Sequence, residues 1–306
     1  MINLKTGIVI IHYNDLESLK HLVENVENYH VISKIVIVDN NSRKDVKKSL
    51  RLITGKKIKL IENKKNFGFA KAINIGCKYL IKELGPCNLI ISNSDVIIDK
   101  EEDLKALIKE LNKKSVGVVA PTIVENKHLN RGWKNPSPFL DSMLNLIYVH
   151  RFFRKKYVFY KEKHYDSRTS LVDVVSGCFF IMKSRTLERI GYLDEHTFLY
   201  YEENILAKKI HNEKLYIEVC NDILIIHNHS VSIDKNVKKI NKLKLQKESQ
   251  YYFQTTYNHA NLWERMLLKT TAFCSRMILA VVYFLKDLIG HCTVLIQNFD
   301  QRGCGI

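Results

Sequence analysis

The chain has 306 residues, 46% of them apolar, so it is long and apolar enough to bury a sizeable core, which argues against a disordered protein. Its net charge of +16 favours a polyanionic partner such as nucleic acid, anionic lipid or a phosphorylated small molecule. Seven dispersed cysteines form no C-x-x-C pair, which argues against a zinc site or disulfide framework and indicates a reducing, cytoplasmic location.

The first half of the chain alternates apolar runs with amphipathic segments. A helix is predicted where Leu16, Leu19, Val23 and Val26 share one face, a second over 67–84, and a third around 104–111. Strands are predicted at 7–12, 34–39, 57–62, 88–92 and 116–121. This alternation indicates βαβ units and an α/β fold with a mostly parallel sheet.

The second half is less regular. The segment 126–170 shows little regular periodicity and is expected to be mostly loop. It is followed by a predicted strand at 174–183, a helix ending at Gly191, a helix at the end of 194–211, and a last strand at 223–229. Beyond residue 235 the chain is lysine-rich and helical, so we expect a catalytic domain over 1–235 and a basic helical extension over 236–306.

Neither end of the chain predicts membrane insertion. The N-terminal apolar run is too short for a signal peptide. The longest apolar runs, 277–285 and 288–299, are separated by Lys286 and Asp287, whereas a spanning helix needs about 20 apolar residues.

Polar residues end or follow three predicted strands, at His12, at Asp39 and in the turn 92–95. Ligands of open parallel sheets bind beyond the carboxyl ends of the strands. Asp95 would suit Mg²⁺ or Mn²⁺ bound to a diphosphate, although a turn capping the next helix is the simpler explanation of this motif taken alone. Asp39 would accept a hydrogen bond from a nucleobase or ribose, or would cap the helix near Arg43.

Three further features allow both structural and functional interpretations. Gly68, with lysines nearby, fits either an anion site at a helix start or a tight turn, and Gly76 fits close helix–sheet packing. Glu202 and Glu203 begin a helix beside aromatic residues, so either is a candidate base or an ordinary first-turn acid. His227 and His229 share one face of a strand, a moderate signal for metal or phosphate.

Taken in order, five motifs resemble the family 2 glycosyltransferases of GT-A fold. They are most similar to bacterial rhamnosyltransferase-type enzymes that build surface polysaccharide. The resemblance covers about 1–235 and rests on 38–42 (VDNNS), 66–76 (NFGFAKAINIG), 92–96 (SNSDV), 176–203 and 225–232 (IIHNHSVS).

The resemblance implies an inverting transfer, with a divalent cation, from a nucleotide-diphosphate sugar such as dTDP-rhamnose or a UDP-sugar. Glu203, or its neighbour Glu202, would be the base, and Asp95 with His227 would hold the metal. Asn93 stands where many relatives carry the first acid of D-x-D. The residues expected around the donor nucleotide are His12, Asn14, Asp39, Asn41, Gly68, Lys71 and Ser94.

The expected acceptor is a growing, lipid-linked glycan of a capsule, exopolysaccharide or O-antigen. By resemblance, the turn at Ser176 and Gly177 would line the acceptor side. Trp133 would either stack on a sugar or pack a loop onto the core. The basic tail would lie on an anionic membrane surface, making the protein peripheral, or would form a helical cap or dimer interface.

Two other classes compete with this interpretation. A sugar-1-phosphate nucleotidyltransferase would carry a glycine-rich loop after the first strand, and 12–20 contains no glycine. A basic nucleic-acid-binding protein would interleave aromatic and basic residues on exposed strands, whereas these lysines lie in loops, on helix faces and in the tail, so no nucleic-acid partner is expected. A non-catalytic scaffold of the same fold also remains open.

Overall fold

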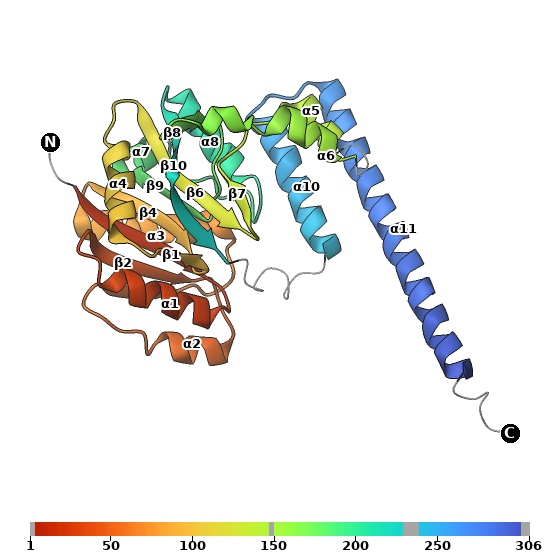
Figure 1. Ribbon diagram of the computed structural model, residues 1–306, viewed down its shortest axis with the longest axis horizontal. Helices are drawn as coiled ribbons and strands as arrows, with labels where there is room; N and C mark the ends of the chain where they lie inside the picture. Colours follow the sequence, from red (N-terminus) through yellow and green to blue (C-terminus); the bar gives the residue numbers. More distant parts are fainter. Residues whose placement is uncertain (1–3, 147–149, 229–238, 301–306) are drawn as a thin grey trace.

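The computed structural model describes residues 4–146, 150–228 and 239–300 (Figure 1). Their strands join one ten-stranded sheet. These strands are β1 (Lys5–His12), β2 (Ile32–Asp39), β3 (Ile58–Glu62), β4 (Cys87–Asn93), β5 (Val96–Ile97), β6 (Val116–Glu125), β7 (His128–Asn130), β8 (Thr169–Val172), β9 (Phe179–Lys183) and β10 (Tyr216–His227).

Helices cover both faces of this sheet and form a separate group at its side (Figure 1). Those packed on the sheet are α1 (Leu16–Glu27), α2 (Lys44–Leu50), α3 (Phe69–Leu84), α4 (Glu101–Leu111), α7 (Ser184–Arg189) and α8 (Glu202–Asn212). The others are α5 (Pro138–Leu144), α6 (His150–Phe153), the π-helical turn η1 (Arg154–Val158), the 3₁₀ turn η2 (Glu162–Tyr165), α10 (Lys239–Thr256) and α11 (Leu262–Asp300).

The sheet order is β3-β2-β1-β4-β9-β6-β10-β5, with β7 paired to β6 and β8 paired to β10. Strands β1 to β4 are mutually parallel, and β6 is parallel to β10. Because β9 is antiparallel to both β4 and β6, all these longer strands except β9 run the same way. Their carboxyl ends therefore meet at one edge.

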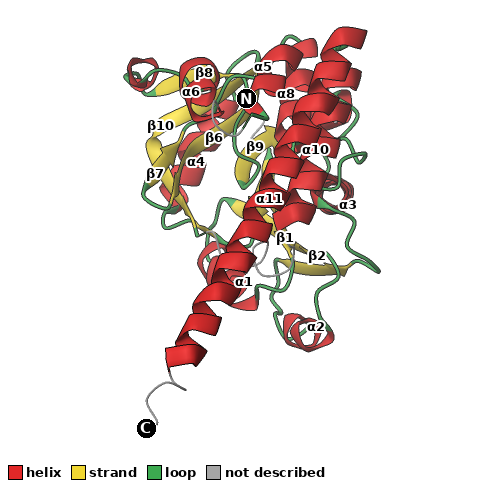
Figure 2. Ribbon diagram, turned by 90° about the vertical axis from the view of Figure 1, so that its right-hand side faces the viewer, coloured by secondary structure: helices red, strands yellow, loops and turns green. Residues whose placement is uncertain are grey.

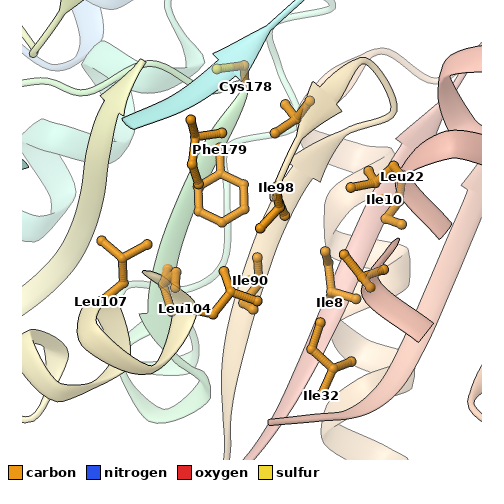
Figure 3. Close-up of a cluster of buried hydrophobic side chains, with 14 of the residues drawn as sticks. Ile8, Ile10, Leu22, Ile32, Ile90, Ile98, Leu104, Leu107, Cys178 and Phe179 are labelled. Atoms are coloured by element: carbon orange, nitrogen blue, oxygen red, sulfur yellow. The ribbon is translucent and has the colours of Figure 1, made fainter. Parts of the chain in front are cut away.

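The core forms two layers, one on each face of the sheet. Successive side chains of a strand point to opposite faces, so Ile8 and Ile10 join one layer and Val9 the other. The first layer lies under α1 and α4 (Figure 3). The second lies under α3, α7 and α8. Burial on both faces explains why the strands are continuous apolar runs rather than alternating ones.

Close helix–sheet contact explains one of the glycines. Gly76 of α3 faces β1, where a Cβ atom would lie 2.4 Å from Cγ1 of Val9. A larger residue would push the helix off the sheet, so the packing interpretation of Gly76 is confirmed.

The C-terminal helices lie beside the sheet domain. Helices α10 and α11 run side by side, α5 packs against α11, and α11 extends past the end of α10 (Figure 2). Within the described part of the chain, no helix combines the length and apolarity needed to cross a bilayer. The expected domain boundary near 235 lies outside the described residues.

The mostly parallel α/β sheet and the helical extension are confirmed, while some element boundaries were wrong. The strand predicted from 223 begins at Tyr216, because Asn221 and Asp222 interrupt the apolar run where the register shifts between Cys220 and Leu224. The strand predicted from 174 begins only at Phe179, after a turn. In the segment expected to be loop, β7 forms a hairpin with the preceding β6, and β8 pairs with the distant β10.

Candidate active site

The carboxyl ends of the parallel strands bring together polar residues that are far apart in sequence. His12 and Asp39 are register partners at the ends of β1 and β2. Glu125 ends β6 and His227 ends β10. Ser94 and Asp95 form the turn between β4 and β5, and β5 pairs with β10 beside His227. The edge predicted from strand ends therefore exists.

Asp95, His227 and Glu125 form a connected cluster. Nε2 of His227 lies 3.1 Å from Oδ1 of Asp95, and Nδ1 lies 2.8 Å from Oε1 of Glu125. A carboxylate on one ring nitrogen fixes the orientation of the imidazole and directs the other nitrogen, as in many carboxylate–histidine–metal arrangements. Burial lowers the pKa of His227, but hydrogen bonds to Asp95, Cys178 and Glu125 outweigh it and raise the pKa to about 12.

The donor set of this cluster fits a divalent cation. The ligand atoms of Glu125, Cys178 and His227 all lie within 4.8 Å of one another, and Asp95 contacts the same imidazole. Carboxylate oxygens suit Mg²⁺ and Mn²⁺, and imidazole nitrogen is a ligand of other divalent transition metals. Sequence reasoning missed Glu125 because Pro121 appeared to end the strand, which in fact continues four residues further.

Gly177 and Cys178 connect this cluster to the acidic pair. The Gly177 N–H donates to Oε1 of Glu203 at 3.3 Å, while Cys178 contacts His227. A Cβ at Gly177 would lie 2.7 Å from the same Glu203 oxygen, so only glycine fits without displacing that carboxyl group. Burial raises the pKa of Glu203, and hydrogen bonds from backbone N–H groups oppose the rise.

Glu202 is more buried than Glu203. Both carboxyl groups line a small cavity together with apolar side chains such as Phe69, Val175 and Leu206. Oε2 of Glu202 has no hydrogen-bond partner among the described residues. Burial, reinforced by repulsion from Glu203, raises the pKa of Glu202 well above its ordinary value and so favours the neutral form of this carboxyl group.

Asp39 organises the loops that follow β1 and β2. It is fully buried and accepts hydrogen bonds from the N–H of Ser42 at 3.2 Å and from the Ser42 hydroxyl at 2.5 Å. Helix α2 has Arg43 as its N-cap residue, without a side-chain cap, so the capping alternative for Asp39 is wrong. Asn14 links the two loops, because its N–H donates to Ser42 Oγ and its Oδ1 accepts from the Arg43 N–H, both at 2.8 Å.

Asn40, which sequence reasoning overlooked, holds the loop before α3. Its side-chain amide donates to Asn66 Oδ1 and to the Gly68 carbonyl, at 2.8 and 3.0 Å, and its Oδ1 accepts from the Phe67 N–H at 3.0 Å. Gly68 has φ of 82°, and a Cβ there would lie 2.3 Å from the Phe198 carbonyl oxygen. The turn interpretation of Gly68 therefore holds, and the first N–H of α3 already donates to Phe198.

The other residues expected to bind the donor nucleotide lie at the same edge of the sheet, and they differ in solvent exposure. His12 is completely buried, and burial lowers its pKa to about 4. Lys71 pairs with Glu195 at 3.2 Å, and Asn41, which has φ of 68°, accepts from Lys47. Ser94 is buried in its turn beside Asp95. His229 lies outside the described residues.

Trp133 packs a loop against the second core layer. Its backbone pairs with Val174 through two hydrogen bonds of 3.0 Å, and the side chain is partly buried. The packing alternative is thus realised, and the side chain retains some exposure.

Solved structures share this arrangement of sheet and helices. The chain superposes on GalNAc-T7 in complex with UDP, GalNAc and Mn²⁺ with a TM-score of 0.57 and 14% identity, covering 74% of this chain but only 44% of that one. It superposes on the mannosyltransferase PcManGT from Pyrobaculum calidifontis, in complex with GDP-Man and Mn²⁺, with a TM-score of 0.55 and 14% identity, covering 92% and 80%. The fold is GT-A.

The sequence comparisons then define the family. Residues 7–191 match Glycosyl transferase family 2, and the chain belongs to that family. It is 25% identical over 225 residues to the low-salt glycan biosynthesis hexosyltransferase Agl10 of Haloferax volcanii, which covers 74% of this chain and 67% of that protein.

Proposed function

We propose that this glycosyltransferase moves a hexosyl group, with inversion, from a nucleotide-diphosphate sugar to a hydroxyl group of a growing glycan. The observation that carries the proposal is the contact of two consecutive residues with two functional groups: Gly177 with Glu203, and Cys178 with His227. A base and a cation-binding cluster thus flank one turn. The similarity to a glycan-building hexosyltransferase supports the glycan acceptor.

Glu203 acts as the general base. Inversion requires no covalent enzyme intermediate, so one carboxylate must take the proton of the acceptor hydroxyl as that oxygen attacks the anomeric carbon. The hydrogen bond from Gly177 directs Oε1 of Glu203. A raised pKa makes this carboxylate a better proton acceptor than an exposed one, whereas burial of Glu202 favours its neutral form.

Asp95 and His227 hold the divalent cation, and Glu125 orients the imidazole of His227. When bound, Mg²⁺ or Mn²⁺ supplies positive charge that stabilises the departing diphosphate. Two structural neighbours were solved with Mn²⁺ and nucleotide ligands, which supports the assignment. The loops held by Asp39, Asn14 and Asn40 border the same rim and bind the nucleoside of a dTDP- or UDP-linked sugar.

Helix α11 attaches the enzyme to an anionic membrane surface, where a lipid-linked acceptor would be located. Its exposed apolar side chains recur every three, four or seven residues and so form one stripe, composed of Trp263, Met266, Phe273, Met277 and Val281. Exposed Lys269 and Arg276 lie along one side of this stripe, and the chain carries a net charge of +16. An apolar stripe with basic residues beside it is typical of helices that lie in the interface of an anionic bilayer.

A donor screen tests the proposed reaction. Purified protein with Mn²⁺ or Mg²⁺ is incubated with UDP-, dTDP- and GDP-sugars, and release of nucleoside diphosphate is measured together with thermal stabilisation. One donor should be hydrolysed slowly, and NMR of the product should show an inverted anomeric centre. Release of pyrophosphate from a nucleoside triphosphate and a sugar 1-phosphate would instead identify a nucleotidyltransferase, and no turnover with any donor would favour a scaffold.

A further inference from the structure

We propose that helix α10 of the C-terminal extension positions the loop of residues 194–201 and, through it, Glu203; this rests on the proposed role of Glu203 as the base. The loop ends in two consecutive left-handed residues, Tyr200 and Tyr201, with φ of 73° and 67°. Non-glycine residues adopt this conformation at a free-energy cost, so contacts elsewhere must hold it. Helix α8 and Glu203 follow directly.

The first of these contacts fixes Tyr201. Its hydroxyl donates to both carboxylate oxygens of Asp141, at 2.8 and 2.9 Å, and Nε2 of Gln254 in α10 donates to the same carboxylate at 2.7 Å. Asp141 and Gln254 are essentially inaccessible to solvent, and the ring of Tyr201 packs 5.6 Å from that of the fully buried Phe253. A buried carboxylate with these donors has few alternative arrangements, so it anchors the strained residue.

Helix α10 also holds the rest of the loop. The Ser249 hydroxyl donates to the Leu199 carbonyl at 2.8 Å. The hydroxyls of Tyr252 and Tyr257 both donate to Oδ2 of Asp194, at 2.8 and 2.5 Å. Helix α10 and Tyr257, which follows it directly, therefore contact the loop at Asp194, at Leu199 and, through Asp141, at Tyr201.

The opposite side of the loop contacts the start of α3. The Phe198 carbonyl accepts from the Phe69 N–H at 3.1 Å, and its oxygen occupies the space that a side chain at Gly68 would need. Glu195 pairs with Lys71 of α3. Because the loop is held between α3 and α10, removing its contacts with α10 allows Tyr201 and the following Glu203 to shift while the sheet remains intact.

Two conservative variants test this role. Tyr201→Phe removes only the hydroxyl group. Ser249→Ala removes a single hydrogen bond to the loop, and it keeps the test valid if the Tyr201→Phe protein does not fold. Tyr251→Phe is the matched control, because the Tyr251 hydroxyl lies on the same helix and makes no hydrogen bond within the described residues. Full-length proteins are compared by hydrogen–deuterium exchange and by steady-state transfer kinetics.

We expect faster exchange in peptides covering 194–204 in both variants, with the strand peptides unchanged. A displaced base costs transition-state stabilisation rather than donor binding, so kcat should fall, by up to about 10²-fold, with little change in donor KM. The Tyr251→Phe protein should match the wild type. Unchanged exchange, or faster exchange with wild-type kcat, would overturn the positioning role. If the two variants show faster exchange in peptides 194–204 but the wild-type protein transfers no sugar, the proposed function would be refuted and the positioning role would stand.

Discussion

The backbone N–H of Gly177 lies 3.3 Å from Oε1 of Glu203, and a Cβ atom at Gly177 would lie 2.7 Å from the same oxygen. These residues are 26 positions apart, and they meet because the turn before β9 reaches the edge where α8 begins. The contact selects one carboxylate of an acidic pair whose members sequence alone could not distinguish. The other carboxylate, Glu202, faces apolar side chains.

Replacing each acid by its amide should separate their roles. Glu203→Gln removes the proton acceptor and should lower kcat by about 10²–10⁴-fold, the usual contribution of general-base catalysis. Glu202→Gln is the matched control and should retain most activity, since a protonated carboxyl group in an apolar cavity resembles an amide. Initial rates with the donor identified by the screen measure both. Equal losses in the two variants would contradict the assignment.

The pH dependence of transfer should reflect the environment of Glu203. Burial raises the pKa of this group, so on acidification it takes up its proton at a higher pH than an exposed glutamate does. Activity requires the ionised form, and kcat should therefore fall below a midpoint lying above the ordinary glutamate value. A pH–rate profile at saturating donor measures this midpoint. An acid limb at or below that ordinary value would show that a different group acts as the base.

Cation binding should depend on both Asp95 and Glu125, to different extents. Asp95→Asn removes a ligand and should abolish detectable Mn²⁺ binding, whereas Glu125→Gln only weakens the orientation of His227 and should reduce affinity about 10–100-fold. Titration calorimetry or Mn²⁺ electron paramagnetic resonance reports affinity without catalysis. The exposed Asp99 follows on the same segment, and Asp99→Asn serves as control. Wild-type affinity in Asp95→Asn would remove the proposed site.

Cation binding should also release a proton. Without a cation, the carboxylates around His227 raise its pKa to about 12, so the imidazole is protonated at neutral pH. A ring nitrogen must lose that proton to bind a metal, so about one proton should leave per cation and affinity should rise with pH. Calorimetry in buffers of different ionisation enthalpy measures the release. Identical heats in all buffers would show that His227 is not a ligand.

Helix α11 should bring the protein to anionic vesicles. The full chain should sediment with vesicles containing phosphatidylglycerol and less with pure phosphatidylcholine, and salt should weaken the interaction. Placing glutamates at Trp263 and Phe273 should abolish sedimentation. Leu52→Glu, at an equally exposed leucine far from α11 in sequence, should not. The wild-type chain could instead fail to bind vesicles but form dimers that the glutamate variant does not form, as measured by light scattering. That result would show that the stripe contacts a second copy of the chain.

Much of the fold follows from local pattern. The apolar runs between 7 and 121 and the amphipathic helices between them predict a parallel sheet, because each run must be buried on both faces. The strand ends then locate the edge that carries Asp39 and Asp95, since parallel strands bring their carboxyl ends together. The nearby motifs resemble those of family 2, and the match over 7–191 confirms that membership.

The pattern of residues along the chain therefore predicts the sheet, its functional edge and the family. Which groups face each other across that edge depends on tertiary contacts. Glu125 orients His227 from 102 residues away, and α10 reaches Tyr201 through Asp141. Local pattern records which side chains are buried, but hydrogen-bond partners depend on the three-dimensional approach of distant segments, which no short window of sequence specifies.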